Sequence, residues 1–300
     1  MGKAYLYLVL VILLWALTPV LVVVLAGSMT VHQMNFLATG LTLSVLAVTV
    51  SIQGKWARMK RYTRRDWLIM LLLGAAGIFP FKTFYYLAFA LVPGSAGELN
   101  IINFTWPVLV VLLSPLILKE RMTVFRILGA VVSFTGAALI VSRGWSMEFQ
   151  PERLPAYLCM IASAIAWGLF SIFTKKNRFE ALTATFVYNL SAFVCFGGLF
   201  LMTSTFRNPS LRDWALLMVL GGGATGVGYL LWIIALRLGD TAKVSNAVFL
   251  IPFVTLIYLA VLRGERIRFL QIAALGLIIA GAVIQHLRGR RVHPMPPPRG

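Results

Sequence analysis

The sequence predicts an all-α integral membrane protein with ten transmembrane helices, arranged as two inverted five-helix repeats. Three observations support this fold class. Of the 300 residues, 60% are hydrophobic and 12% are charged, and the mean hydropathy is +0.88, whereas soluble domains carry about 25% charged residues. The apolar residues form ten runs, each near the roughly 20 residues that span hydrocarbon. The chain also contains one unit twice.

The repeat becomes visible when the sequence is shifted against itself. A shift of 145 positions aligns identical residues: Ala90 with Ala235, Leu91 with Leu236, Gly94 with Gly239, Phe104 with Phe249, Pro107 with Pro252, Glu120 with Glu265, Arg121 with Arg266 and Gly136 with Gly281. A shift of 152 positions aligns Trp15 with Trp167. We therefore expect two copies of one unit, at residues 1–145 and 146–287, as is typical of transporters.

The ten expected helices follow the apolar runs in chain order. They cover residues 4–26, 32–53, 66–92, 95–118, 123–142, 155–174, 182–204, 212–236, 243–262 and 268–287. The first run follows Lys3 and is too long for the apolar region of a signal peptide, so we expect it to be retained. Residues 288–300 form a basic, proline-rich tail, which we expect to be disordered and cytoplasmic.

Charged residues in the loops predict the orientation of the chain. With the N-terminus in the cytoplasm, nineteen Lys and Arg residues lie on that side and seven on the other, and Lys82 lies inside a helix. We therefore expect both termini to be cytoplasmic, in the inner membrane of a bacterium. Because five helices is an odd number, the second copy enters the membrane upside down. Two such halves can exchange conformations, which opens one mouth of a cavity while closing the other.

Glycine and proline interrupt several of the expected helices. The third run contains Gly74, Gly77 and Pro80, and the eighth contains Gly221, Gly222, Gly223, Gly226 and Gly228. These residues predict either bends beside a cavity or ordinary close packing. In helices five and ten, Gly129-x3-Ser133 and Gly276-x3-Ala280 predict a close approach, within one chain or between two. We expect a monomer or a weak homo-oligomer.

The order of helices and motifs resembles a known superfamily. Pro107 in helix four is followed by Lys119-Glu120-Arg121 and then by Gly136-Ala137. With ten helices in two copies, this pattern resembles the drug/metabolite transporter superfamily, and in particular its EamA-type repeat and the YddG-like amino-acid exporters. The second copy has the family's Gly-Glu ending at Gly264-Glu265, whereas Lys119 replaces that glycine in the first. The resemblance implies export of amino acids, aromatic ones included, through a cavity between helices one, three and four and their repeat partners.

Lys82 is the most informative single residue. It lies about ten residues from the end of helix three, or about 15 Å deep at 1.5 Å per residue. A charge at that depth costs at least about 2.5 kcal/mol and normally faces a cavity or a partner. We expect Lys82 to bind a substrate carboxylate; the alternatives are an ion pair with Glu98 and a snorkelling stem. Its repeat partner at an offset of 145 is near Val227 and is uncharged.

Glu98 and its repeat partner Lys243 each lie near the start of a helix and have opposite charges. One interpretation places both at the membrane interface as ordinary helix-end charges. The other makes Glu98 a site for a substrate ammonium group or for a coupling proton.

Two tryptophans and several amides complete the candidate substrate site. Trp15 and Trp167 lie about eleven residues into their helices, too deep for interfacial anchors, so we expect their rings to stack on an apolar or aromatic substrate. The family resemblance also points to Trp167. Amides are costly in lipid and face protein or water, although hydrogen bonds between helices are an alternative use. The remaining candidates are Asn103, Trp106 and Asn246, together with Tyr86, which follows Lys82 at helical spacing.

Other classes of function receive little support. Cys159 and Cys195 lie in apolar runs without metal-ligand spacing, and the chain has no GxxxxGK[ST] motif. Nine scattered acidic residues do not suggest a Mg²⁺-dependent enzyme, and the net charge of +18 lies in short loops, which argues against a nucleic-acid partner. We predict a secondary transporter, not an enzyme, without cofactor or metal, whose partners are amino acids and the lipid bilayer. The alternatives are an exporter of hydrophobic cationic drugs, which would use Glu98, and a channel.

Overall fold

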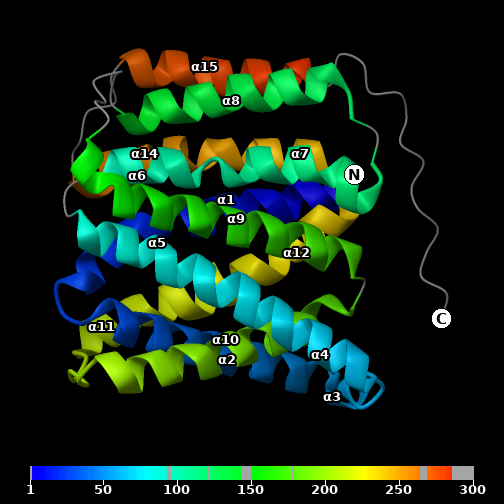
Figure 1. Cartoon of the computed structure of the whole chain (residues 1–300), viewed down its shortest axis with the longest axis vertical. Coiled ribbons are helices and arrows are strands. Elements are labelled where there is room, and N and C mark those ends of the chain that lie inside the picture. The colour runs from blue at the N-terminus through cyan, green and yellow to red at the C-terminus, as the bar shows by residue number, and fades with distance from the viewer. Residues whose placement is uncertain are drawn as a thin grey trace.

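The computed structural model describes residues 2–92, 96–120, 122–142, 150–177, 179–263 and 269–285. Within these ranges all regular elements are helices, which confirms the all-α fold class. Nine helical spans in the described ranges are long and apolar enough to cross a membrane, and the tenth expected helix is described over Phe269–Ile284. The helices lie side by side in layers, and their ends form two opposite faces (Figure 1). The predicted tail lies outside the described residues.

The two copies contain a similar succession of elements, apart from three short helical turns. The first comprises α1 (Gly2–Ala26), α2 (Val31–Ile52), α3 (Trp56–Met59), α4 (Arg64–Leu73), the π-helix η1 (Gly74–Ile78), α5 (Phe79–Leu91), α6 (Ala96–Asn103), α7 (Trp106–Leu118) and α8 (Val124–Ser142). The second comprises η2 (Pro151–Arg153), α9 (Leu154–Lys176), α10 (Ala181–Thr203), α11 (Leu211–Leu217), the π-helix η3 (Met218–Val227), α12 (Gly228–Leu238), α13 (Thr241–Ala247), the 3-10 turn η4 (Val248–Leu250), α14 (Ile251–Arg263) and α15 (Phe269–Ile284).

Contacts between the copies occur in exchanged pairs. Helix α1 packs on α12, and its counterpart α9 packs on α5. Helix α2 packs on η3, and α10 packs on η1 in the same way. Helices α8 and α15 pack on each other along their length at one side of the molecule (Figure 1). This exchange of partners is what a pseudo-two-fold axis between two repeats requires.

The structure corrects the register of helices three and eight. Thr63 and Asp66 form a capping box at the start of α4, and Ser210 and Asp213 form the same box at the start of α11. The offset is therefore 147 residues. Helices α5 and α12 end at the same offset. The offset returns to 145 only in the loops that follow α5 and α12, which differ in length by two residues. Ala90 and Ala235 are therefore not structurally equivalent, and their match at an offset of 145 is a coincidence of composition.

The glycines of helices three and eight serve close packing, the second of the two expected uses. The chain forms π-helices at η1 and η3. A Cβ on Gly74 would lie 2.1 Å from the Tyr188 carbonyl oxygen, and one on Gly221 would lie 2.2 Å from that of Ala38. These glycines therefore permit the close backbone approach that joins each π-helix to the other copy.

Helices four and nine are each divided into two half-helices, which the sequence did not predict. The chain turns between α6 and α7, immediately before Pro107, and at η4, immediately before Pro252. Proline supplies no backbone N–H to a preceding helical turn. The short helices α6 and α13 are thereby separated from the long helices α7 and α14.

The close approach of helices five and ten uses a different glycine from the one expected. Cβ atoms on Gly129 and Gly281 would each lie 2.5 Å from the other residue's carbonyl oxygen, and Ser133 Oγ donates to the Ile278 carbonyl at 3.0 Å. Gly276 has open space around it. The predicted Gly276-x3-Ala280 pair is therefore not the contact, because Gly281 lies on the interface instead.

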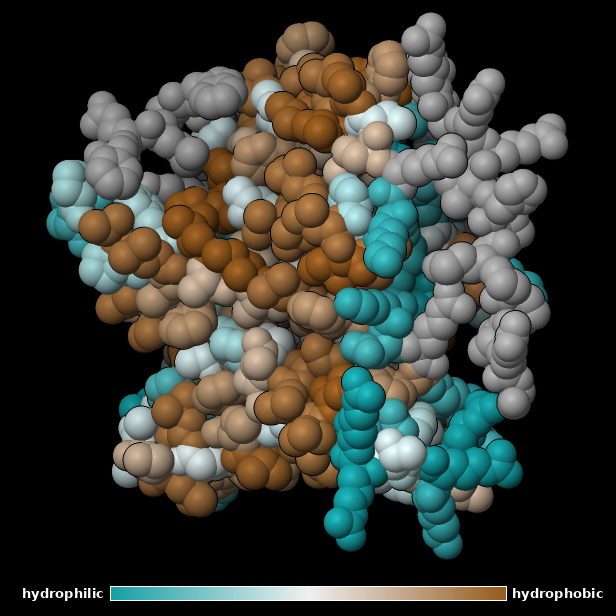
Figure 2. All heavy atoms as spheres, turned by 45° about the vertical axis from the view of Figure 1, so that its right-hand side comes forward, coloured by the Kyte–Doolittle hydropathy of each residue, from teal (hydrophilic) through white to brown (hydrophobic). Residues whose placement is uncertain are grey.

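The surface separates into an apolar band and a polar face. Figure 2 shows hydrophobic side chains over the middle of the molecule and hydrophilic ones gathered along one edge. The start of α1 and the end of α15 lie on the same face (Figure 1). We call this the termini face and the opposite one the distal face.

Candidate substrate site

A cavity of about 300 Å³ lies between the two copies. Its residues lie near mid-depth or toward the distal face, since they include the later part of α1, the end of α8 and the second half of α14. It is lined by Trp15, Thr18, Pro19, Phe81, Lys82, Tyr85, Tyr86, Asn100, Asn103, Phe104, Trp106, Ile140, Val141, Trp167, Leu220, Ala224, Thr225, Tyr229, Ile251, Pro252, Thr255, Leu256 and Leu259. This volume is at the lower end of small-molecule sites.

Four indoles form one cluster at the inner end of the cavity: Trp15, Trp106, Trp167 and Trp232. The centroids of Trp15 and Trp167 are 5.7 Å apart at an interplanar angle of 72°, and Trp106 and Trp232 are 5.3 Å apart at 88°. Trp15 Nε1 donates to the Ala224 carbonyl at 3.0 Å, and Trp232 Nε1 donates to Ser171 Oγ at 3.0 Å. These hydrogen bonds hold the rings in place, so the tryptophan cluster forms a fixed apolar floor.

Lys82 projects from α5 into the cavity and is 4% exposed. Its Nζ lies 3.3 Å from Thr39 Oγ1 and 5.7 and 5.9 Å from the ring centroids of Phe196 and Tyr229. No carboxylate forms an ion pair with it within the described side chains. Two aromatic faces and one hydroxyl stabilise a cation only partly. The ammonium therefore has N–H groups left to donate to an anionic ligand.

Polar groups of α6 face the same space. Asn103 Nδ2 donates to Ser163 Oγ at 3.3 Å, and Tyr85 hydroxyl donates to Asn100 Oδ1 at 2.9 Å. Ser163 Oγ in turn donates to the Phe81 carbonyl at 3.0 Å. These bonds fix α6 against α5 and α9, so the amides form one polar wall.

The structure brings six of the predicted site residues to one cavity: Trp15, Lys82, Tyr86, Asn103, Trp106 and Trp167. Their role in binding stays a prediction. The side chain of Glu98, the predicted ammonium or coupling site, lies outside the described residues.

Asn246 does not line this cavity, contrary to expectation. It is 1% exposed and borders a separate apolar hollow against α15, with residues such as Ile278 and Ala282. Its neighbour Ser245 is the counterpart of the cavity residue Asn100 at the 145 offset. Neighbouring side chains on a helix point about 100° apart, since 3.6 residues make one turn. Asn246 therefore points toward α15 instead.

Sequence reasoning missed several lining residues. The Tyr229 ring packs at a tilt against Trp167 with centroids 4.6 Å apart, and the Phe81 ring does so at 4.7 Å. At the corrected offset of 147, Tyr229 is the repeat partner of Lys82. The capping boxes at Thr63 and Ser210 could have revealed that offset.

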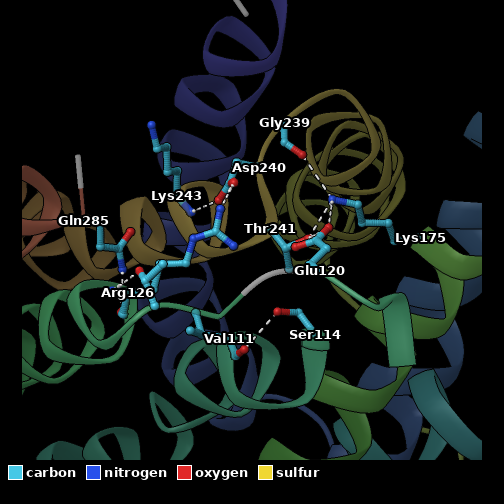
Figure 3. A network of polar contacts seen from close by, with 11 residues as sticks. Val111, Ser114, Glu120, Arg126, Lys175, Gly239, Asp240, Thr241, Lys243 and Gln285 are labelled. Carbon is cyan, nitrogen blue, oxygen red and sulfur yellow. Dashed lines mark hydrogen bonds and ion pairs between the residues drawn. The ribbon is translucent and has the colours of Figure 1, made fainter. Parts of the chain in front are cut away.

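Polar contacts join the helix ends at the termini face (Figure 3). Arg126 at the start of α8 pairs with Asp240, the N-cap of α13. Lys175 at the end of α9 lies 2.9 Å from Glu120 Oε1 and donates to Thr241 Oγ1 at 2.6 Å, and that hydroxyl donates to Glu120 Oε1 at 2.7 Å. We call Glu120, Arg126, Lys175, Asp240 and Thr241 the latch. It connects α7, α8 and α9 with α13.

A further ion pair lies on this face. Lys55 Nζ donates to Glu180 Oε1 at 2.7 Å, and the backbone N–H of Thr183 donates to the same carboxylate at 2.8 Å. Burial acts to raise the pKa of the Glu180 carboxyl, but these hydrogen bonds outweigh it and hold the pKa below its usual value. The loop after α2 is thereby joined to the start of α10.

The half-helices α6 and α13 differ in how they contact the other copy. Helix α13 packs on α7 and α8, where Ala242 lies against Val111 and Ala130. In the described part of the chain, α6 makes no comparable contact with α14, the counterpart of α7. The cavity occupies the space between α6 and α14. The structure is therefore closed at the termini face.

Two stretches that together make up most of the chain match a family model. Residues 2–142 and residues 154–285 each match the model described as the EamA-like transporter family. The chain belongs to the EamA-like transporter family. The two matches correspond to the two copies of the EamA-type unit seen in the fold.

Relatives of this EamA-like transporter include proteins with named substrates. It is 26% identical over 287 residues to the aromatic amino acid exporter YddG of Ancylobacter novellus, covering 93% of this chain and 96% of the relative. It is 28% identical over 305 residues to a probable terminal-alkyne amino-acid exporter of Streptantibioticus cattleyicolor, covering 97% and 96%. A solved crystal structure shares the fold, with a TM-score of 0.85 and 22% identity over 97% of this chain and 99% of its own. The chain is therefore a multi-pass membrane transporter related to amino-acid exporters.

Proposed function

We propose that the protein exports amino acids, aromatic and other apolar ones included, and similar small metabolites across the inner membrane of a bacterium. Transport proceeds by alternating access to the central cavity. Both termini are cytoplasmic, so the termini face is the cytoplasmic face and the cavity faces outward. The observation that carries the proposal is the meeting of Lys82 with an aromatic floor in one cavity.

The two parts of the cavity suit the two parts of an apolar amino acid. The Lys82 ammonium attracts the carboxylate, and a charge-assisted hydrogen bond in a partly dry site contributes about 1.5–3 kcal/mol. Asn100, whose Oδ1 also accepts from Tyr85, offers a carbonyl oxygen to the substrate ammonium. Trp15 and Trp167 contact the side chain, and aromatic pairs add about 0.5–1.5 kcal/mol beyond area burial.

The pseudo-symmetry supports the mechanism. Each copy can adopt the packing that the other now shows, with α6 closing on α14 while α13 leaves α7. The cavity then faces the cytoplasm. Such exchange between inverted repeats needs no unfolding of either copy.

Counterflow in proteoliposomes tests the proposal. Vesicles loaded with unlabelled phenylalanine should accumulate labelled phenylalanine transiently, and the uptake should saturate. Linear, non-saturable flux without counterflow would indicate a channel and contradict the proposal. Protein-free vesicles and vesicles containing Lys82→Met at equal protein levels serve as controls.

The same assay distinguishes export of amino acids from export of hydrophobic cations. The charged side chain that lines the described cavity is a cation, which repels such substrates. Leucine should therefore compete with labelled phenylalanine, and tetraphenylphosphonium should not. Stronger competition by tetraphenylphosphonium would favour the drug-export alternative.

A further inference from the structure

We propose that α13 is the cytoplasmic gate, held shut by the latch, and that Ser245 and Gln285 line the cavity once α13 moves away from α7. This inference rests on the proposed alternating access. It names the residues of the inward-facing site, none of which lines the present cavity.

The counterparts of the lining residues on α6 and α14 meet at the closed seam. At the 145 offset, Asn100, Asn103 and Phe104 of α6 correspond to Ser245, Val248 and Phe249. On the facing helix, Thr255, Leu256 and Leu259 correspond to Val110, Val111 and Ser114. Each of these six counterparts is at most 2% exposed. The seam between α13 and α7 is therefore the closed form of the cavity that lies between α6 and α14.

Unpaired polar atoms at the seam indicate that it opens. Ser245 Oγ and Gln285 Oε1 are buried without a hydrogen-bond partner. Gln285 is the counterpart of the cavity residue Ile140. Buried polar groups are nearly always hydrogen-bonded, so these two unpaired atoms, one on α13 and one at the end of α15 beside α8, are costly in a permanently closed structure. Water or a substrate head group satisfies both atoms when the seam is open.

The latch is placed to control this movement. Asp240 caps the N-terminus of α13 through the Lys243 backbone N–H at 3.2 Å and pairs with Arg126 of α8 through its other oxygen. Thr241, the first residue of α13, bonds to Glu120 and Lys175. Movement of α13 away from α7 therefore breaks the contacts of Asp240 and Thr241 with the rest of the latch. The capping hydrogen bond from the Lys243 backbone to Asp240 is kept, because both residues move with α13.

By sequence, three of the five latch residues have uncharged counterparts at the distal end. The counterparts of Asp240, Arg126 and Lys175 are Ser95, Gln271 and Val23, none of which is charged. A charge-assisted bond is roughly twice as strong as a neutral one. The latch therefore favours the outward-facing form, and loss of its charge shifts the population toward the inward-facing form.

Thiol labelling of Ser245→Cys tests the gate directly. The background carries Cys159→Ala and Cys195→Ala, which removes both native thiols. The reagent is applied at the termini face. Labelling should be slow with the latch intact and at least about tenfold faster in Asp240→Asn, because Asn caps a helix as well as Asp but carries no charge for Arg126.

Two matched variants separate opening of the gate from general loosening. Asp66→Asn removes a partly exposed capping carboxylate at the start of α4 and should leave the labelling of Ser245→Cys unchanged. Ala192→Cys, buried in α10, should stay unlabelled in Asp240→Asn. Equal labelling of Ser245→Cys with and without the latch, or equal acceleration at Ala192→Cys, would overturn the proposal.

A cross-link tests the gate without weakening the fold. Val111→Cys and Ala242→Cys lie on the two sides of the seam and pack together. Joining them with a short methanethiosulfonate cross-linker should abolish phenylalanine counterflow, and a reductant should restore it. Each single cysteine variant, treated alike, should retain transport. Undiminished counterflow in the cross-linked protein overturns the gate, whereas absence of counterflow in the unlinked protein contradicts the proposed function instead.

Discussion

The indoles of Trp15 and Trp167, which are repeat partners, meet edge to face near the middle of the membrane-spanning body, with ring centroids 5.7 Å apart. Trp167 also contacts the tilted rings of Tyr229 and Phe81. The pair therefore joins the two copies at the inner end of the cavity. Its position makes it the natural contact for an apolar substrate side chain.

Trp167→Ala should impair transport of phenylalanine more than that of alanine. The variant removes ring contact with the substrate side chain and leaves the head-group contacts of Lys82 in place. An aromatic contact of about 1.4 kcal/mol corresponds to about tenfold in kcat/KM. Initial rates for both amino acids at matched protein levels measure the difference.

Trp214→Ala is the control for this prediction. Trp214 lies on α11 and is 39% exposed, so its loss should leave both rates unchanged. An equal reduction for phenylalanine and alanine in Trp167→Ala would show that the ring is needed only for packing.

Lys82→Met should reduce transport of phenylalanine and alanine by the same factor. Met keeps much of the stem but has no charge for the carboxylate, and loss of a charge-assisted bond costs about 1.5–3 kcal/mol, or about ten- to a hundredfold. Lys82→Arg should retain part of the activity. Normal rates in Lys82→Met would show that the ammonium makes no substrate contact.

Gly221→Ala should destabilise the protein, because the added Cβ would lie 2.2 Å from a backbone oxygen that has little freedom to move. Overpacking of this kind costs about 1–3 kcal/mol. The matched control is Gly276→Ala, where nothing lies within 4 Å of the new Cβ. Thermal unfolding in detergent should show a lower midpoint for Gly221→Ala alone. A midpoint for Gly221→Ala as high as that of Gly276→Ala would contradict the close approach of η3 and α2.

Single cysteines should establish the orientation of the chain. In the background without native cysteines, Arg58→Cys at the termini face should react only with a reagent present in the cytoplasm. Asn208→Cys, exposed before α11, should react from outside intact cells. Reaction of both from one side would refute the crossing pattern, and reversal of both would refute cytoplasmic termini.

The fold was predictable from the sequence, because long apolar runs and a repeated Pro, Gly and Glu pattern depend on no distant contact. The positions of Lys82, Trp15 and Trp167 followed from the cost of charge and the depth of the indoles. The position of Asn246 did not, because an amide must avoid lipid but can do so on several helix faces. Tyr229 was missed because the 145 offset slips by two residues in helices three and eight.

The latch could not be predicted, because Arg126 and Asp240 are 114 residues apart in the chain and each looks like an ordinary loop charge. Only the packing of α13 on α8 brings them together. The difference between the two ends of the molecule has the same origin, since the equivalent half-helices α13 and α6 pack on the other copy at one end and stay apart from it at the other.

Direct binding of phenylalanine to the purified protein, measured by calorimetry beside phenethylamine, tests the central claim most directly. The two ligands share the ring and the ammonium, and only phenylalanine has a carboxylate. The account predicts saturable binding of phenylalanine, at least about tenfold tighter than that of phenethylamine, and loss of this preference in Lys82→Met. Equal affinity for the two ligands, or tighter binding of phenethylamine, would contradict it.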